Sequence, residues 1–262
     1  MHFEALLTVN YINLFIAVLM PVAMTLVLDT LIRHTPFGKL NKWVRQIIIG
    51  VLFGGLAIIG TEFGIPYENA QLNVRDASVL SAGLMFGPVS GIIAGLIGGI
   101  ERWFSVFWGI SSYTRIACSV STILAGLYSA FLRQFMFDDK RPGVLISFAT
   151  GLVMEVFHLN MVFLTHLDDP YTSIKIVAEL TLPMVVLNSV SVMLSSLSLT
   201  IAHKRYKDRS SRVGSVSGHI QKTLLIVIGT AFIVTTLFVA QIQNSMQNDY
   251  VDRMLDVAIE ET

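Results

Sequence analysis

The stretch ASVLSAGLMFGPVSGIIAGLIGGIERWF, residues 77–104, decides how this chain is threaded. It carries no charge before its last four positions, and Gly87-Pro88 interrupts it. Because Gly-Pro marks a turn, the stretch predicts a hairpin of two helical arms. Each arm of ~14 residues would rise only ~21 Å, less than the hydrocarbon thickness of a bilayer. We therefore expect a turn that is buried among other helices.

Six further stretches are apolar enough to form helices in a membrane. They cover residues 11–32, 46–63, 116–135, 144–164, 176–202 and 223–240. A span needs ~20 such residues, and the composition agrees, with 53% hydrophobic and 14% charged residues. Together with the two arms they predict an all-α, polytopic helical membrane protein of about eight hydrophobic segments.

Basic residues fix the expected topology. Of 18 Lys and Arg, 13 fall in three connections, at residues 33–45, 133–141 and 204–222. If residues 77–104 form a hairpin, all three connections share one side, and the split is 13 against 5; a single crossing would give 8 against 10. Since basic loops stay in the cytoplasm, the hairpin predicts a multi-pass membrane protein with an extracytoplasmic N-terminus.

Several classes of protein are excluded at this stage. The net charge of zero argues against a nucleic-acid partner. Cys118 is the single cysteine, and the chain has no Cys/His metal spacing and no catalytic motif. We expect no enzyme activity within these residues, no cofactor and no metal.

Four glycines follow the turn at a spacing of four, namely Gly87, Gly91, Gly95 and Gly99. Residues four apart return to the same helix face, where small side chains allow another helix backbone to approach closely. We interpret this stripe as a packing surface and assign no ligand to it.

Polar residues gather at the outer mouth of the hairpin. They are Asn73, Arg75, Asp76, Glu101, Arg102 and Arg115. Three of them are arginines, whose planar fork binds a carboxylate through two hydrogen bonds. The alternative is that these arginines only pair internally with neighbouring acids.

Glu155 and His158 lie in the middle of a span, three residues apart on one helix face, within reach of each other or of Asn188. Ionisable groups at that depth are costly and indicate function. They are interpreted as a signal relay; a purely structural latch is the alternative.

An ordered set of motifs resembles the LytS-type five-transmembrane receptor module of bacterial sensor proteins. The set consists of Asn73-x-Arg75-Asp76, Phe86-Gly87-Pro88, the glycine stripe, Glu101-Arg102, the small-residue helix 117–126, Glu155, His158, Pro183 and Asn188. The resemblance covers about residues 35–203. It divides the chain into a first transmembrane helix (1–34), the ligand-sensing module (35–212), a last transmembrane helix (213–242) and the start of an extracytoplasmic segment (243–262).

The resemblance implies a module that binds a small metabolite and signals to a histidine kinase, cyclase or phosphatase output domain. In relatives that respond to short carboxylates, the residues implicated match Arg75, Arg102, Cys118 and Ser121 here. The alternative for Cys118 and Ser121 is plain helix packing.

We therefore expect a membrane sensor module of a signal-transduction receptor in the bacterial inner membrane that binds a small, anionic metabolite from the extracytoplasmic side. Its expected partners are this ligand, the lipid bilayer and a second copy of the chain in a homodimer. The rival function is the substrate-binding subunit of an uptake transporter, because transporters also hold substrates between broken helices.

Overall fold

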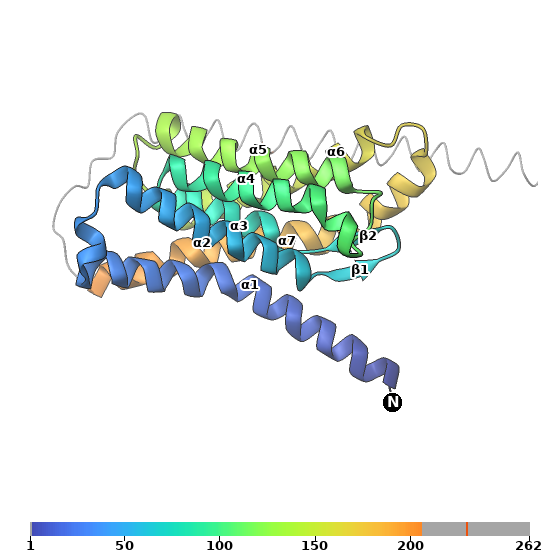
Figure 1. Cartoon of the computed structure of the whole chain (residues 1–262), viewed down its shortest axis with the longest axis horizontal. Helices are drawn as coiled ribbons and strands as arrows, with labels where there is room; N and C mark the ends of the chain where they lie inside the picture. Colours follow the sequence, from blue (N-terminus) through green and yellow to red (C-terminus); the bar gives the residue numbers. More distant parts are fainter. Residues whose placement is uncertain (1, 206–228, 230–262) are drawn as a thin grey trace, which may run out of the picture.

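Long helices lie side by side along most of the chain in a computed structural model, which describes residues 2–205 and Gly229 (Figure 1). They are α1 (His2–His34), α2 (Lys42–Glu62), α4 (Pro88–Phe104), α5 (Arg115–Phe131), α6 (Val144–Leu164) and α7 (Pro170–Arg205). These six, with a 3₁₀ turn added to α4 and a π-helical turn to α5, are the described helices long and apolar enough to cross a membrane. The all-α prediction is confirmed in this form. The segment predicted at 223–240 lies, apart from Gly229, outside the described residues.

The predicted hairpin is present. Helix α3 (Arg75–Ser81) continues through a π-helical turn (Ala82–Phe86) to Gly87, where φ is 131° and the chain reverses into α4. Such a φ favours glycine, and Pro88 at the first position of α4 suits a helix start. The expectation of two short arms is wrong for the second arm, which is a full span from Pro88 to Trp108. The turn lies off-centre, so only the first arm is short.

Polar contacts hold the turn inside the bundle, as expected for backbone that leaves its helix at membrane depth. The Val89 amide donates to Gln46 Oε1 of α2 over 3.0 Å, and Ser90 Oγ donates to the Gln46 carbonyl. Arg133 donates to the Leu84 carbonyl and Arg141 to that of Met85. Two arginines of the basic connection thus satisfy carbonyls at the end of the short arm.

The glycine stripe packs as predicted. A Cβ built on Gly95 would lie 2.9 Å from both the Gly126 Cα and the Thr122 carbonyl oxygen of α5. Gly91 faces Gly83 and Gly126, and Gly99 faces the Ser119 carbonyl. A second pair, Gly50 and Gly54 of α2, faces isoleucines on another side of α4. Helix α4 is therefore in close contact with α2 on one side and with α5 on the other.

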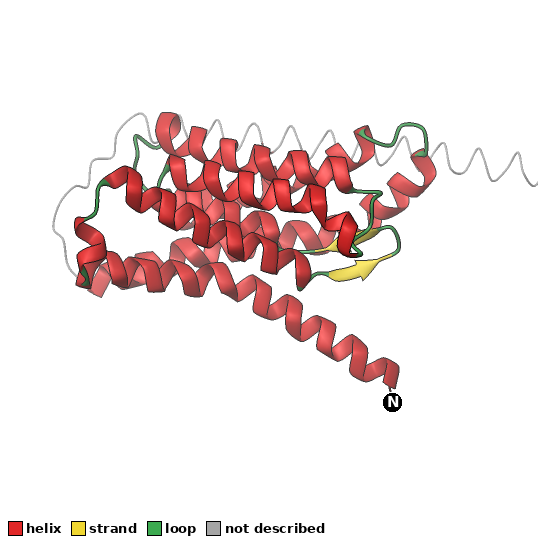
Figure 2. Ribbon diagram, in the orientation of Figure 1, coloured by secondary structure: helices red, strands yellow, loops and turns green. Residues whose placement is uncertain are grey.

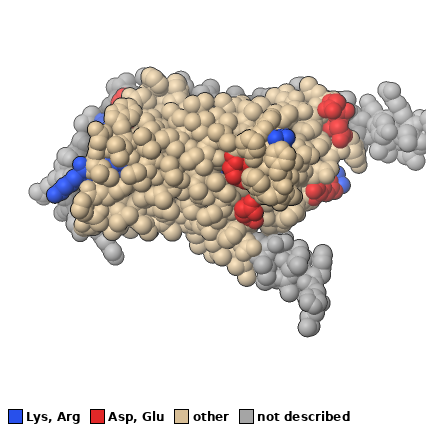
Figure 3. Space-filling model, viewed as in Figure 1, with Lys and Arg blue, Asp and Glu red and all other residues tan. Residues whose placement is uncertain are grey.

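One end of the bundle collects the basic connections (Figure 3). Lys42 at the start of α2 lies 2.6 Å from Asp139, which Arg133 also contacts. Asp29 of α1 pairs with Arg33 and Arg141. Partial burial alone would raise the pKa of Asp139, but hydrogen bonds from Lys42 and Arg133 lower it below its ordinary value. The connections at 35–41 and 137–143 thus share one end.

The opposite end contains a small element that the sequence analysis did not anticipate. Strands β1 (Ile65–Tyr67) and β2 (Ala70–Leu72) pair antiparallel (Figure 2). Glu68 in their turn lies 2.6 Å from Lys175 of α7, and Ser111 donates to the Asn69 carbonyl. The connections 64–74, 105–114 and 165–169 thus meet at this second end.

The tight contact of α4 with α5 predicts a clear effect of Gly95→Ala. The added methyl group has no space against the α5 backbone, so we expect a loss of about 1–3 kcal/mol and a lower melting temperature. Thermal denaturation of the detergent-solubilised chain measures it. Gly55→Ala is the matched control, because its Cβ meets nothing within 4 Å and alanine favours helices. Equal melting temperatures for the two variants would contradict a tight α4–α5 contact.

Candidate functional site

Helix α3 carries charged residues into the interior of the bundle. All seven of its residues are buried, including Arg75 and Asp76 at its first two positions. The helix contacts α2, α4, α5 and α7. A charged pair at this depth must be satisfied by neighbouring helices, because neither water nor lipid can do so.

Arg75 is fully buried and makes three polar contacts. Its Nε donates to Thr122 Oγ1 of α5 over 2.7 Å and lies 3.5 Å from Asp76 Oδ1. Its Nη1 donates to Thr61 Oγ1 of α2 over 3.4 Å. Nη2 has no hydrogen-bond partner among the described residues. This nitrogen of the guanidinium group is thus available to a ligand.

Asp76 and His158 join α3 to α5 and α6. Thr122 Oγ1 donates to Asp76 Oδ1 over 2.7 Å, and Asp76 Oδ2 lies 2.8 Å from His158 Nδ1. The other ring nitrogen of His158 is 3.3 Å from Cys118 Sγ, and Glu155 Oε2 is 3.8 Å from Nδ1. We call this set the polar cluster, with the members Arg75, Asp76, Cys118, Thr122, Glu155 and His158.

Asn73 and Asn188 fix the start of α3. Asn188 Oδ1 of α7 accepts from the Ala77 amide over 3.0 Å, and its Nδ2 donates to the Asn73 carbonyl over 3.1 Å. Asn73 Oδ1 accepts from the Arg75 amide over 3.3 Å. Asn188 therefore holds the backbone of α3, whereas the sequence suggested a pair with Glu155 or His158.

Arg102 is buried near the C-terminal end of α4 and organises the following connection. Its guanidinium nitrogens donate to Ser105 Oγ, the Ser111 carbonyl and Thr114 Oγ1 over 2.8–3.1 Å. The guanidinium groups of Arg102 and Arg75 both lie close enough to the Cys118 thiol to interact with it electrostatically. The structure thus brings together three residues that the sequence assigned to one site.

Glu101 and Ser121 are placed near this region without hydrogen-bond partners in the described chain. Both Glu101 carboxylate oxygens are buried, and the group lies within electrostatic range of Arg75 and Arg102. Ser121 is fully buried, and its hydroxyl is unpaired among the described side chains. Buried polar atoms without partners are rare, so they indicate where a ligand or water completes the structure.

Arg115 does not join the polar cluster. Its Nε donates to the Trp103 carbonyl over 2.7 Å, and its guanidinium carbon lies 4.3 Å from the centre of the Trp103 ring. The alternative considered for the arginines was pairing with neighbouring acids, and Arg115 instead contacts Trp103. It packs at the end of the bundle that carries β1 and β2.

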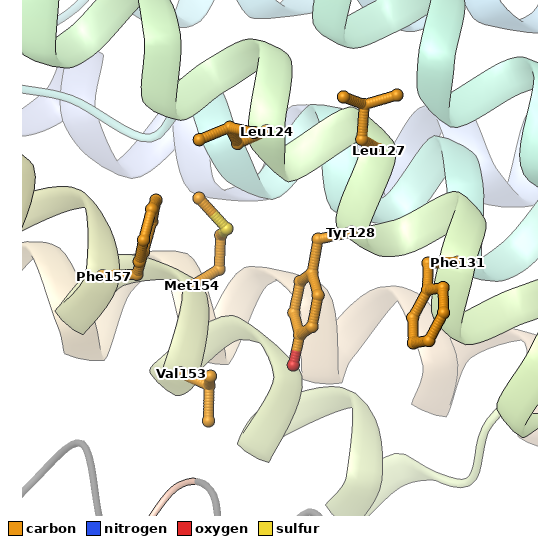
Figure 4. A pocket seen from close by; sticks show the side chains of 7 residues that line it. All are labelled: Leu124, Leu127, Tyr128, Phe131, Val153, Met154 and Phe157. Carbon is orange, nitrogen blue, oxygen red and sulfur yellow. The ribbon is translucent and has the colours of Figure 1, made fainter.

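A pocket of about 380 Å³ lies between α5 and α6, away from the arginines (Figure 4). Its lining is apolar except for the Tyr128 hydroxyl and consists of Leu124, Leu127, Tyr128, Phe131, Val153, Met154 and Phe157. It offers no cation to a carboxylate. We therefore place the candidate anion site at the buried arginines.

Thr61 and Thr122 were missed from the sequence. A threonine in an apolar helix carries no signal of its own, since its hydroxyl commonly bonds to its own helix. The contact between Asp76 and His158 was also missed, because it joins residues far apart in the chain. The one available signal was the free-energy cost of burying Asp76 or His158 without a partner, which indicates that each needs one.

The fold and the polar cluster define a polytopic helical membrane protein whose core holds charged residues. The family model described as the 5TMR of 5TMR-LYT matches residues 28–202, more than half of the chain, and the chain belongs to this family of LytS-type receptor modules. The five long helices α2, α4, α5, α6 and α7 fall within the match or reach just beyond it.

Curated relatives are bacterial sensor proteins. The sensor histidine kinase BtsS of Escherichia coli K12 is 27% identical over 192 residues, which cover 70% of this chain and 33% of the relative. The sensor histidine kinase YpdA of the same strain is 32% identical over 141 residues, covering 53% and 24%. The sensor protein LytS of Staphylococcus epidermidis RP62A is 24% identical over 211 residues, covering 72% and 34%.

The chain thus spans between 24% and 34% of the length of these three relatives. No solved structure matches it. The chain is a membrane sensor module of the kind found in two-component sensor kinases.

Thr122 provides a direct test of the polar cluster. Thr122→Val keeps the shape of the side chain but leaves Arg75 Nε and Asp76 Oδ1 without their hydroxyl partner. We expect a loss of about 1–3 kcal/mol in unfolding free energy, seen as a lower melting temperature. Thr122→Ser, which keeps the hydroxyl, should retain most of the stability. If Thr122→Val and Thr122→Ser have the same melting temperature, the hydroxyl does not bridge Arg75 and Asp76.

Proposed function

We propose that this module binds a small carboxylate from the extracytoplasmic side and passes a conformational change to an output unit of the kind that sensor histidine kinases carry. The observation that carries the proposal is that two buried arginines, Arg75 and Arg102, lie within electrostatic range of Cys118, with Arg75 Nη2 unpaired among the described residues. Buried guanidinium groups bind carboxylates strongly because water competes weakly there.

In this proposal each residue has a role. Arg75 and Arg102 bind the carboxylate, and Cys118 and Ser121 contact the rest of the ligand. Asn73 orients the start of α3. Glu101, whose carboxylate oxygens have no hydrogen-bond partner in the described chain, would accept a hydrogen bond from a donor on the ligand.

The proposed signal is a shift of α3 against α6 and α7. His158 of α6 contacts Asp76, and Asn188 of α7 holds the α3 backbone. A ligand on Arg75 would act one residue from Asp76, so it would bias both contacts. Such a relay needs two arrangements of the same groups, and Glu155, beside His158, offers a second partner.

The arginines give the binding prediction. Arg75→Lys should weaken binding of a short carboxylate by more than tenfold, because an ammonium group cannot make two parallel hydrogen bonds to a carboxylate. Lysine is chosen because it keeps the positive charge beside Asp76. Arg102→Ala should weaken it similarly, since losing one partner of a desolvated charge pair costs about 2–5 kcal/mol. Calorimetry with pyruvate and lactate on the solubilised chain measures both.

Arg115→Ala is the matched control, since this arginine packs on Trp103. It should bind like the unaltered protein. Unchanged affinity in both Arg75→Lys and Arg102→Ala would remove the arginines from the site. Tight binding of neutral solutes alone would favour the uptake-subunit function, which the sensor relatives do not support.

The orientation is also proposed, with the basic end in the cytoplasm and the β1–β2 end outside. In a Cys118→Ser background, Asp168→Cys should react with a membrane-impermeant thiol reagent in intact cells, and Lys140→Cys only after lysis. Both positions are exposed, so access to the reagent is decided by the membrane. Reaction of Lys140→Cys in intact cells would reverse the orientation.

A further inference from the structure

Three side chains of the polar cluster converge on one point. Asp76, Glu155 and His158 come from α3 and α6, and each is at most 1% exposed. One ligand-type atom from each lies within 4.8 Å of the other two. Both oxygens of Glu155 lack a hydrogen-bond partner in the described chain. A buried carboxylate in that state is aimed at something other than a protein donor.

The spacing of these atoms fits a metal ion. Tetrahedral Zn²⁺ with Zn–N and Zn–O bonds of about 2.0–2.2 Å separates its ligand atoms by about 3.3–3.5 Å. The two separations at His158 Nδ1 are 2.8 Å to Asp76 Oδ2 and 3.8 Å to Glu155 Oε2. They bracket the required value, so shifts of about half an ångström would suffice for these two separations, and the oxygens of Asp76 and Glu155 lie within 4.8 Å of each other. Although 2.8 Å apart, Nδ1 and Oδ2 are not aligned as a hydrogen bond.

Two of the atoms that would not bind the ion already have partners. His158 Nε2 lies against Cys118 Sγ, and Asp76 Oδ1 accepts from the Thr122 hydroxyl. Metal ligands are usually oriented by such outer contacts on their far side. The histidine and one carboxylate are thus fixed with their inner atoms directed at the common point.

When His158 is neutral, a cation at this point would compensate Glu155. Arg75 compensates Asp76 at 3.5 Å, but the imidazole of His158 is the nearest cationic partner of Glu155 among the described contacts. A buried carboxylate needs a positive partner or it is strongly unfavourable. One imidazole and two carboxylates suit a borderline divalent ion better than Mg²⁺ or Ca²⁺, which prefer oxygen ligands alone.

We propose that Asp76, Glu155 and His158 bind one divalent transition-metal ion, with Zn²⁺ as its representative. This differs from the expectation of no metal, which rested on the missing Cys/His spacing. The three ligands were hidden because Asp76 is far from the other two along the chain. The proposal goes beyond carboxylate binding and does not depend on it.

Metal binding is tested with Zn²⁺ alone. The full solubilised chain is stripped with a chelator and titrated calorimetrically at neutral pH, and bound metal is counted by mass spectrometry. We expect one Zn²⁺ per chain. Glu155→Gln and His158→Gln should each weaken binding at least about tenfold, since even outer partners of metal ligands are worth 10–100-fold. Glu68→Gln is the control, because this surface carboxylate pairs with Lys175 at the far end of the bundle.

Two outcomes overturn the proposal. One is that the unaltered chain binds no Zn²⁺. In that case a proton, and not a metal ion, would lie between the carboxylates and His158. The other is Zn²⁺ bound equally by all variants, which places it at the surface. If the cluster variants fail to fold, the absorption spectrum of the unaltered chain loaded with Co²⁺ decides. A four- or five-coordinate spectrum without a thiolate band supports the site, because Cys118 faces the other ring nitrogen of His158 and would not bind the ion. A six-coordinate, solvent-like spectrum refutes it.

Discussion

The buried pair Arg75–Asp76 constrains the rest of the bundle. Removing an ion from water costs several kcal/mol, and mutual attraction offsets this only when the remaining polar atoms find partners. Arg75 finds them in Thr61 and Thr122, and Asp76 in Thr122 and His158. Since these partners come from three helices, α2, α5 and α6 must all surround the start of α3.

A short helix can occupy this central place only because its neighbours approach closely. Gly83 and Gly91 let the two arms meet, and Gly126 lets α5 lie directly on α4. The break at Gly87 exposes carbonyls that a continuous helix would have satisfied. Arg133 and Arg141 donate to two of them, so basic residues that mark the topology also stabilise the end of the broken helix.

The hairpin and the glycine stripe were predictable from residues 77–104, because helix breaks and small-residue spacing are local signals. The length of the second arm was not predicted correctly. It follows from the off-centre position of the turn, which leaves more residues in the second arm than in the first. For the site, the family resemblance suggested the group of Arg75, Arg102 and Cys118, and their role in binding stays a prediction. The contact of Asp76 with His158, and the use of Asn188 on the α3 backbone, depend on tertiary packing that no local pattern encodes. The contact of Arg115 with Trp103 was not predicted either, because a sequence cannot tell a buried guanidinium from one that lies on an aromatic ring.

The arrangement also explains why α3 is suited to transmit a signal if a ligand reaches Arg75. Its seven helical residues make few hydrogen bonds of their own, and side chains of α5, α6 and α7 hold its first turn. A displacement of this turn must therefore break or lengthen contacts to α6 and α7 together. Close packing against α4 and α5 permits few intermediate positions, because packed interfaces switch between discrete arrangements more readily than they deform. Helices α6 and α7 would then move as a pair. Both adjoin the basic end of the bundle, α6 through residues 137–143 and α7 through His203. Their movement would couple the arginines to this end, from which the chain continues beyond α7.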